Sequence, residues 1–255
     1  MTHCTGDVKE NICMTTPTAI SLFCSSGIGD LALRRAGIDV LVANELINER
    51  CNLFKNNFPT THLIEGSIWE QKNKVINDTL EILEGRSLDF ALVTPPCQGM
   101  SKNGRGKLLA EIRAGRRSKV DDRNMLIIPS LEIIKKLQPT TVVFENVPEM
   151  INTVIPFEGS VIGIVELIKQ ELSDWLVEAK IVEFADYGVP QKRQRLITIA
   201  TKNGRLLNSF TTEGTLFPNT THSRNGCLFT EKWKTVREVI GDFEPLDGLS
   251  KPKSK

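Results

Sequence analysis

The segment around Cys97 has the composition of a reactive-cysteine site. Pro95 and Pro96 come immediately before Cys97, and two prolines restrict the backbone so that the thiol is presented at a defined point. A cysteine is nucleophilic when part of it is thiolate, and cationic neighbours lower its free pKa of about 8.5. The residues from Met100 to Arg123 carry a net charge of +5. The segment therefore predicts a nucleophilic cysteine, although a buried, inert thiol is the commoner state.

A second group of residues could handle protons and anions. Glu145 stands at the end of an apolar run, and if burial keeps its carboxyl partly protonated near neutral pH, it can serve as a proton donor. Arg193 and Arg195 are two positions apart, and in an extended segment that spacing places both on one face. Such a pair suits a phosphate group or the carbonyl of a base.

A glycine-containing turn and an acidic residue indicate a nucleotide-like cofactor. The segment Phe23–Asp30 reads FCSSGIGD, and small residues let the backbone turn tightly and approach a ligand at a helix N-terminus. Glu45 follows 22 residues after Phe23, at the end of the next apolar run, where an acid can accept hydrogen bonds from ribose hydroxyls. Together they predict an adenosine-type cofactor. The simpler alternatives are a turn made for packing and an exposed strand-end glutamate.

These residues need a sheet to bring them together. Short β-branched runs alternate with amphipathic stretches, which is typical of βαβ units and predicts an α/β fold with a doubly wound, mostly parallel sheet. Ligands bind such sheets beyond the carboxyl ends of the strands, where the turn, Cys97 and Glu145 all fall. The predicted strands are Ala19–Cys24, Asp39–Asn44, His62–Gly66, Asp89–Val93, Thr141–Glu145, Val177–Phe184 and Arg195–Thr201. The predicted helices are Asp30–Ala36, Asn48–Asn56, Trp69–Leu83, Asn124–Leu137 and Val161–Leu172.

Two segments interrupt the alternation. Ser101–Arg123 is rich in Gly, Lys and Arg and predicts a long loop, mobile and close to the active site. Within Lys202–Lys255 only Trp233–Ile240 is predicted to be helical. Residues 191–255 carry a net charge of +6, so both basic segments could approach a polyanion or could be solvated loops. We predict a flexible N-terminus at 1–16, a catalytic domain at 17–201 and an extension at 202–255.

Composition excludes several classes of protein. The 255 residues are 40% hydrophobic and 25% charged, which is usual for a globular chain and unlike a disordered, collagen-like or disulfide-rich one. No apolar run reaches the ~18 residues of a membrane helix, and the N-terminus does not resemble a secretion signal. The six cysteines and three histidines are scattered. We therefore expect free thiols, no metal site and a cytoplasmic location.

Five segments, taken in order, resemble those of DNA cytosine-5 methyltransferases. They are Phe23–Gly29, Glu45, Pro95–Gln98, Glu145–Val147 and Gln191–Arg195. The resemblance extends from about Ala19 to about Ile240, and Trp233–Gly241 is similar to the stretch that leads into the family's target-recognition domain. It implies a Rossmann-like, class I S-adenosylmethionine-dependent methyltransferase with helices on both faces of the sheet, acting on C5 of cytosine in duplex DNA.

For the cofactor, the resemblance implies that Phe23 stacks near the adenine of S-adenosylmethionine and that Glu45 holds its ribose. Two positions depart from the family pattern. Ser25 stands at the first glycine position of the loop, and Ser67 stands where the family often has Asp for the adenine amine. The full set of residues implied to contact the cofactor is Phe23, Ser25, Ser26, Gly27, Glu45, Ser67, Ile68, Pro95 and Leu126.

For the reaction, the resemblance implies that Cys97 attacks C6 of a flipped-out cytosine. Glu145 would contact N3 and the exocyclic amine, Arg195 would hold O2, and Arg193 would orient the site. C5 becomes nucleophilic only after the thiolate adds at C6, which cannot happen inside a stacked duplex. The residues implied to close over the DNA are Gln98, Ser101, Arg113, Arg116 and Arg117.

The family's recognition domain and its closing cofactor motif have no counterpart after Ile240. We therefore expect the chain to act as the larger, catalytic part of a split prokaryotic enzyme of the restriction-modification type, completed by a second polypeptide. A truncated chain is the alternative. A tRNA cytosine-5 methyltransferase and an inactive DNA- or partner-binding remnant stay open as alternative functions, and a nucleotide-binding dehydrogenase is a distant third.

Overall fold

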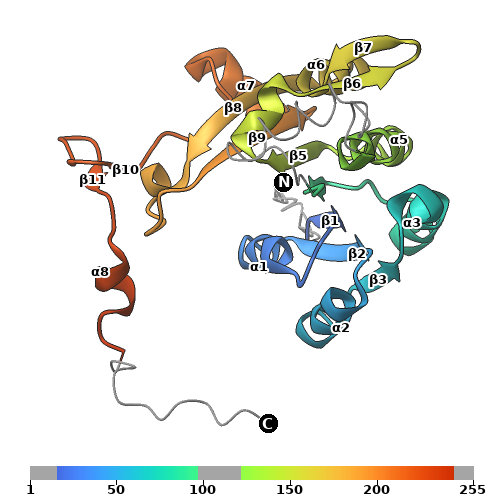
Figure 1. Ribbon diagram of the computed structural model, residues 1–255, viewed down its shortest axis with the longest axis horizontal. Helices are drawn as coiled ribbons and strands as arrows, with labels where there is room; N and C mark the ends of the chain where they lie inside the picture. The colour runs from blue at the N-terminus through green and yellow to red at the C-terminus, as the bar shows by residue number, and fades with distance from the viewer. Residues whose placement is uncertain (1–15, 97–121, 244–255) are drawn as a thin grey trace, which may run out of the picture.

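The computed structural model describes residues 16–96 and 122–243, and its centre is a seven-stranded sheet in the order β3-β2-β1-β4-β5-β9-β8 (Figure 1). Six of its strands run in the same direction, and β9 runs antiparallel to both of its neighbours, β5 and β8. The predicted α/β fold with a mostly parallel sheet is therefore confirmed. The strands are β1 (Thr18–Leu22), β2 (Asp39–Glu45), β3 (His62–Glu65), β4 (Phe90–Val93), β5 (Thr141–Asn146), β8 (Leu176–Glu183) and β9 (Gln194–Thr201).

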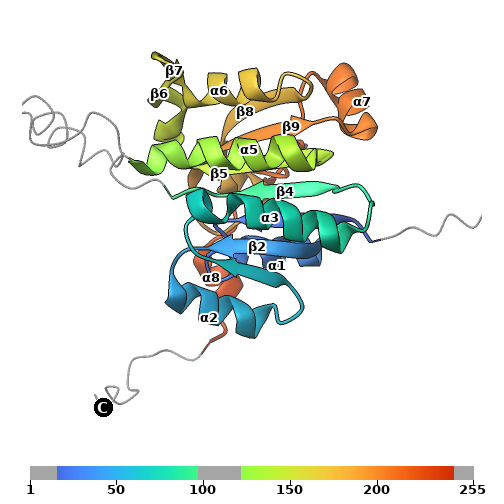
Figure 2. The ribbon, with the colours of Figure 1, turned by 90° about the vertical axis from the view of Figure 1, so that its right-hand side faces the viewer.

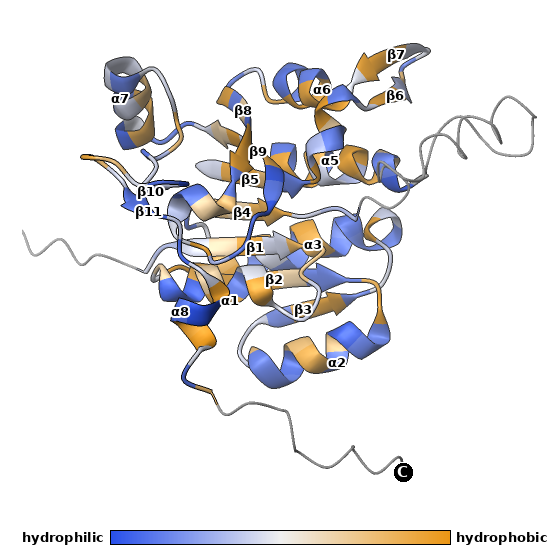
Figure 3. Cartoon of the chain, turned by 60° about the vertical axis from the view of Figure 1, so that its left-hand side comes forward, coloured by the Kyte–Doolittle hydropathy of each residue, from blue (hydrophilic) through white to orange (hydrophobic). Residues whose placement is uncertain are grey.

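The central strands are apolar because helices cover them on both sides. All five residues of β1 are buried, which is the pattern of a strand inside a parallel sheet. In Figure 3 the strands at the centre are largely hydrophobic, whereas α2 is mostly hydrophilic. Right-handed crossovers place α1 and α2 on one face, and α3, α5 and α6 on the other (Figure 2). These helices are α1 (Ile28–Arg35), α2 (Asn48–Asn57), α3 (Ile68–Leu83), α5 (Ile127–Leu137) and α6 (Ile164–Glu171).

The structure differs from the predicted elements in three places. The predicted helix Val161–Leu172 was wrong at its start, because Ser160–Gly163 forms strand β7, which pairs with β6 (Val154–Phe157). The predicted helix Asn124–Leu137 begins as a short 3-10 helix, η1 (Asp122–Leu126), and α5 starts at Ile127. An unpredicted helix, α7 (Gly204–Glu213), follows β9.

The last described segment leaves the sheet. It contains the short strands β10 (His222–Ser223) and β11 (Glu231–Lys232) and the helix α8 (Val236–Ile240), which falls within the predicted helix Trp233–Ile240. Two 3-10 helices complete the description, η2 (Pro148–Asn152) and η3 (Phe184–Tyr187). Among the described residues, no helix is both long and apolar enough to cross a membrane. Most of the predicted loop Ser101–Arg123 and the N-terminal residues 1–15 lie outside the described residues.

Candidate active site

A cavity of about 450 Å³ opens at the carboxyl ends of β1, β2, β4 and β5. This is the edge at which doubly wound sheets bind ligands, and the volume is that of a small-molecule site. The lining joins the predicted cofactor residues to Glu145 in one continuous space. The lining residues are Phe23, Ser25, Asn44, Glu45, Leu46, Ile47, Arg50, Gly66, Ser67, Ile68, Thr94, Pro96, Arg123, Leu126 and Glu145.

Glu45 is the buried carboxylate of this cavity, with 5% of its surface exposed. Its Oε2 accepts a hydrogen bond of 2.9 Å from the backbone N–H of Ser25, and its Oε1 accepts from the N–H groups of Leu46 and Ile47, each at 2.9 Å. The three amides stabilise the charge that burial would otherwise penalise. Glu45 therefore ties the turn after β1 to the end of β2.

The turn after β1 has an unusual backbone. Phe23 has φ 63°, Ser25 has φ 53° and Gly27 has φ 90°, which is the left-handed region that residues with a Cβ rarely adopt. At Gly27 a Cβ would also lie 2.2 Å from the ring of Phe58, so this position requires glycine. Strain of this kind persists only where surrounding contacts impose it, and here it directs the backbone of the turn toward the cavity.

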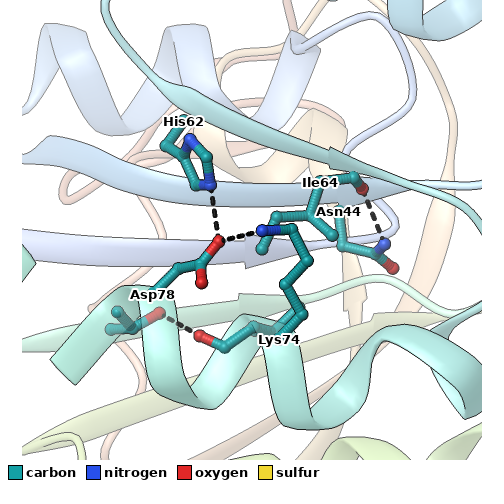
Figure 4. Close-up of polar contacts among 7 residues, drawn as sticks. Asn44, His62, Ile64, Lys74 and Asp78 are labelled. Atoms are coloured by element: carbon teal, nitrogen blue, oxygen red, sulfur yellow. Dashed lines mark hydrogen bonds and ion pairs between the residues drawn. The ribbon is translucent and has the colours of Figure 1, made fainter. Parts of the chain in front are cut away.

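Asn44 builds the opposite wall. Its buried side chain donates a hydrogen bond of 2.8 Å to the carbonyl of Ile64 (Figure 4). It also donates one of 3.1 Å to the carbonyl of Gly66, which holds the turn that presents Ser67 and Ile68. At the other end of β3, Asp78 on α3 contacts both His62 and Lys74 at 2.7 Å. The contact with His62 joins α3 to β3, whereas Lys74 lies on α3 itself.

Glu145 and Arg195 form an ion pair at the second candidate site. Nε of Arg195 lies 2.7 Å from Oε1 of Glu145, and the two side chains are 17% and 32% exposed. Arg195 also donates from NH1 to the carbonyl of Gln194 at 2.7 Å. The pairing depends on β9 running antiparallel to β5, because the start of β9 then meets the end of β5. The carboxyl group is thus held by a cation in a half-buried position.

Two hydrogen bonds place the segment that leads to Cys97. Asn146 donates from its side chain to the carbonyl of Pro95 at 3.2 Å, and Thr94 donates from its hydroxyl to the carbonyl of Phe23 at 3.1 Å. The end of β4 is therefore fastened both to β5 and to the turn after β1. Cys97, the predicted nucleophile, lies outside the described residues, as do Gln98, Ser101, Arg113, Arg116 and Arg117.

The structure brings most of the remaining candidates together. Phe23, Ser25, Glu45, Ser67, Ile68 and Leu126 line the cavity with Glu145. Ser26, Gly27 and Pro95 do not line it; Gly27 and Pro95 are buried behind it. Arg193 is exposed, and its backbone N–H donates to Glu183 at 2.7 Å. Within the described part of the chain, no group of three or more His, Cys, Asp or Glu side chains could hold a metal ion.

Several lining residues were missed by the sequence reasoning. Leu46 and Ile47 are 62% and 39% exposed, although they are large and apolar, and they follow Glu45 directly. The sequence did contain a signal for Leu46 and Ile47. Two aliphatic residues directly after a strand-end acid can contact an adenine ring while the acid binds the ribose. Asn44, Arg50 and Thr94 gave no comparable signal, because a single polar residue near a strand end is common.

Comparisons with known proteins agree on one family. The model of the C-5 cytosine-specific DNA methylase family matches residues 18–253. The chain is 35% identical over 202 residues to the Type II methyltransferase M1.HgaI of Avibacterium volantium, covering 79% of this chain and 53% of that protein. It is 29% identical to the Type II methyltransferase M.AquIA of a Picosynechococcus strain, with 89% of this chain and 88% of that protein covered.

One solved structure shows that the same fold occurs at lower sequence identity. A crystal structure described as a prophage-encoded DNA modification methyltransferase from E. coli superposes with a TM-score of 0.60 at 22% identity, covering 89% of this chain and 55% of that one. The chain thus spans about half the length of M1.HgaI and of this structure, and most of the length of M.AquIA. By its matched residues, the chain belongs to the family of C-5 cytosine-specific DNA methylases.

Proposed function

We propose that the protein transfers a methyl group from S-adenosylmethionine to C5 of cytosine in duplex DNA, in a bacterial cytoplasm. The observation that carries this proposal is the single cavity that joins Glu45, at the end of β2, to Glu145, which is paired with Arg195. A site for a nucleoside and a site for a polar ring thereby share one space. The Type II methyltransferases among the relatives support DNA over tRNA as the substrate.

The cavity fits the cofactor in its hydrogen-bond acceptors and in its apolar lining. A carboxylate has about four lone-pair sites, and three on Glu45 accept backbone N–H groups, which leaves one for a ribose hydroxyl. Apolar side chains from three elements surround the same space and suit an adenine ring. They are Leu46, Ile47, Ile68 and Leu126. When bound, the cofactor supplies the electrophilic methyl group.

The protein's own residues would prepare the base for transfer. Cys97 adds to C6 of the extruded cytosine, which moves electron density to C5 and breaks the aromaticity of the ring. Glu145 contacts N3 and the exocyclic amine, and Arg195 binds O2, so charge that develops on the ring is stabilised by groups already in place. C5 then accepts the methyl group, a base removes the C5 proton, and the C6–sulfur bond breaks.

A duplex containing 5-fluorocytosine tests this mechanism, because fluorine blocks removal of the C5 substituent and leaves the enzyme on C6. We expect a denaturation-stable adduct that requires S-adenosylmethionine. Cys97→Ser should abolish it, while the control Cys227→Ser, at an exposed thiol remote from the cavity, should retain it. An adduct formed equally by Cys97→Ser would refute the assignment, and equal trapping on tRNA would overturn the choice of DNA.

We further propose a second polypeptide as a partner. Large apolar side chains are exposed along residues 228–243: Leu228, Phe229, Val236, Val239, Ile240 and Phe243. Contiguous apolar exposure of this kind marks an interaction surface. The purified chain should transfer methyl groups to DNA poorly, and a small protein encoded beside it should restore transfer. Full, sequence-specific transfer by the chain alone would contradict this proposal.

A further inference from the structure

A second pocket, of about 280 Å³, lies apart from the cavity that holds Glu45 and Glu145. Its lining includes four cations, Lys192, Arg224, Lys232 and Lys234, and no carboxylate. All four side chains are exposed, and none forms an ion pair with an acidic residue in the described part of the chain. Unpaired cations converging on one concave surface are the electrostatic signature of an anion site.

An aromatic floor gives the pocket a fixed shape. Nε1 of Trp233 donates a hydrogen bond of 2.8 Å to Oδ1 of Asp186, so the indole ring cannot rotate freely. Nζ of Lys192 lies 5.5 Å from the centre of that ring, within the range of a cation–π contact. The ring therefore positions one of the cations and presents a flat apolar surface beside them.

The segment that carries the other three cations is attached to η3. The N–H of Thr221 donates to the carbonyl of Asp186 at 3.0 Å, and the N–H of Trp233 donates to the carbonyl of Ser223 at 2.9 Å. The buried ring of His222 packs on Gly188, where a Cβ would lie 2.8 Å from it. Arg224, Lys232 and Lys234 thus project from an anchored backbone, which lowers the entropy lost when they bind an anion.

The topology places this pocket at the same edge of the sheet as Glu145 and Arg195. Glu183, at the end of β8, is opposite Gln194, at the start of β9, and Asn146, at the end of β5, is opposite Leu196. The η3 helix and residues 188–193 fill the turn between β8 and β9, so the pocket adjoins the strand start that bears Arg195. A duplex whose cytosine enters the cavity would pass over this edge.

The acidic residues around the pocket are already engaged. Asp186 accepts from Trp233, and Glu231 lies 3.4 Å from His222. The carboxylate of Glu238 accepts from Thr235 in the N-terminal cap of α8, and its pKa is lowered first by those hydrogen bonds and then by Lys232 and Lys234. None of these three carboxylates lines the pocket, whose lining carries four cations.

We propose that this basic pocket binds backbone phosphates of the duplex beside the target cytosine, with Trp233 against the adjoining sugar. This proposal rests on the proposed function only in naming DNA as the polyanion. Phosphate contacts fix the register of a protein on DNA without reading sequence. The pocket would hold the duplex while Glu145 and Arg195 bind the extruded cytosine.

The dependence of DNA affinity on salt tests the proposal, because each phosphate contact contributes about 0.9 to the slope of log K against log salt. The measurement is fluorescence anisotropy of the full chain with a labelled duplex. The double variant with Lys232→Ala and Lys234→Ala should reduce the magnitude of this slope by about 1.8. The matched control, Lys136→Ala combined with Arg205→Ala, removes the same charge at the opposite edge of the sheet and should leave the slope unchanged.

Equal slopes for the wild type and the Lys232/Lys234 variant would overturn the proposal, as would equal losses in both double variants. Methyl transfer by the wild-type chain with its proposed partner is measured in parallel. A failure of the phosphate-site proposal can then be distinguished from a failure of the proposed function. A pocket-dependent slope without methyl transfer would support the phosphate site and refute the proposed function. Methyl transfer together with a salt slope that the Lys232/Lys234 substitutions leave unchanged would support the proposed function and refute the phosphate site.

Discussion

Nε of Arg195 contacts Oε1 of Glu145 at 2.7 Å across two antiparallel strands, although fifty residues separate them in the chain. The ion pair holds a carboxyl and a guanidinium side by side, and in the proposed reaction such a pair would contact two sides of a planar polar ring. Groups that are already in place would not need to rearrange as charge develops on the base.

Breaking this pair while keeping its charge should disable the chemical step. Arg195→Lys retains the cation but loses the planar fork that Arg presents, and we expect the methyl-transfer rate in single-turnover assays to fall by about 10²–10³-fold. Affinity for S-adenosylmethionine should stay at the wild-type value. Glu149→Gln, a change in the neighbouring η2 helix, is the control and should leave the rate intact; a normal rate for Arg195→Lys would remove Arg195 from the site.

Glu45 should control affinity for the cofactor. Glu45→Ala removes the acceptor proposed for the ribose, and we expect binding measured by calorimetry to weaken by about 1.5–3 kcal/mol, as for a hydrogen bond to a charged group. The matched control Glu49→Ala removes an exposed acid from the first turn of α2. If both variants bind the cofactor as tightly as the wild type, Glu45 has no such role.

Gly27 should tolerate no side chain. In Gly27→Ala the new methyl group meets the ring of Phe58 at 2.2 Å and the backbone keeps φ at 90°, so we expect the free energy of unfolding to fall by about 2–4 kcal/mol. Gly37→Ala separates the two causes, because Gly37 has φ 76° and no atom within 4 Å of the added Cβ. It should cost only the backbone strain, about 1 kcal/mol. Equal losses in denaturant titrations would exclude the clash with Phe58.

Asp30 should make the protein less stable as the pH rises. The side chain is fully buried, its carboxyl oxygens have no hydrogen-bond partner in the described residues, and burial raises its pKa from 3.8 to about 6. Between about pH 4 and 6 the folded protein therefore binds more protons at this site than the unfolded chain, so stability falls through that window and stays lower above it. The difference corresponds to about 3 kcal/mol.

The neutral isostere Asp30→Asn provides the measurement. Its free energy of unfolding should exceed that of the wild type by about 1–3 kcal/mol at pH 8, and the gain should shrink toward pH 4, where the wild-type carboxyl is protonated. Urea titrations at both pH values give the two differences. A gain of the same size at pH 4 and pH 8 would show that titration of Asp30 is not its cause.

The parallel half of the fold could be predicted from sequence because burial there is uniform. The strand Thr18–Leu22 is covered on both faces and buried at all five positions, so it is mostly apolar, and the glycine turn that follows it marks its end. Asp39–Glu45 was predicted to within one residue for the same reason. The functional residues then fell at the strand ends, which the topology brings to one edge.

The elements beyond β5 were harder because their signals were mixed. Val161 and Ile162 fit the apolar period of the following helix, yet they pair with β6 across a tight turn in which Glu158 and Gly159 both have positive φ. In α7 the caps were visible, with Asn203 accepting from Arg205 and Leu206 and with Gly214 at the end. Leu206, Leu207 and Phe210 have helical spacing, but the Gly, Asn and Thr residues around them favour a loop and obscured this short pattern. No residue of α7 is buried.

The reversal of chain direction at β9 also has a consequence for biosynthesis. The elements that carry Phe23, Glu45 and Ser67 all lie within the first 83 residues of the chain, so the cofactor-binding wall can form on a nascent polypeptide early in translation. Glu145 gains Arg195 only after β9 has emerged from the ribosome and inserted between β5 and β8. The Glu145–Arg195 pair, for which we propose base binding, therefore forms last, and a chain released before Thr201 retains Glu45 but lacks the strand that completes the pair.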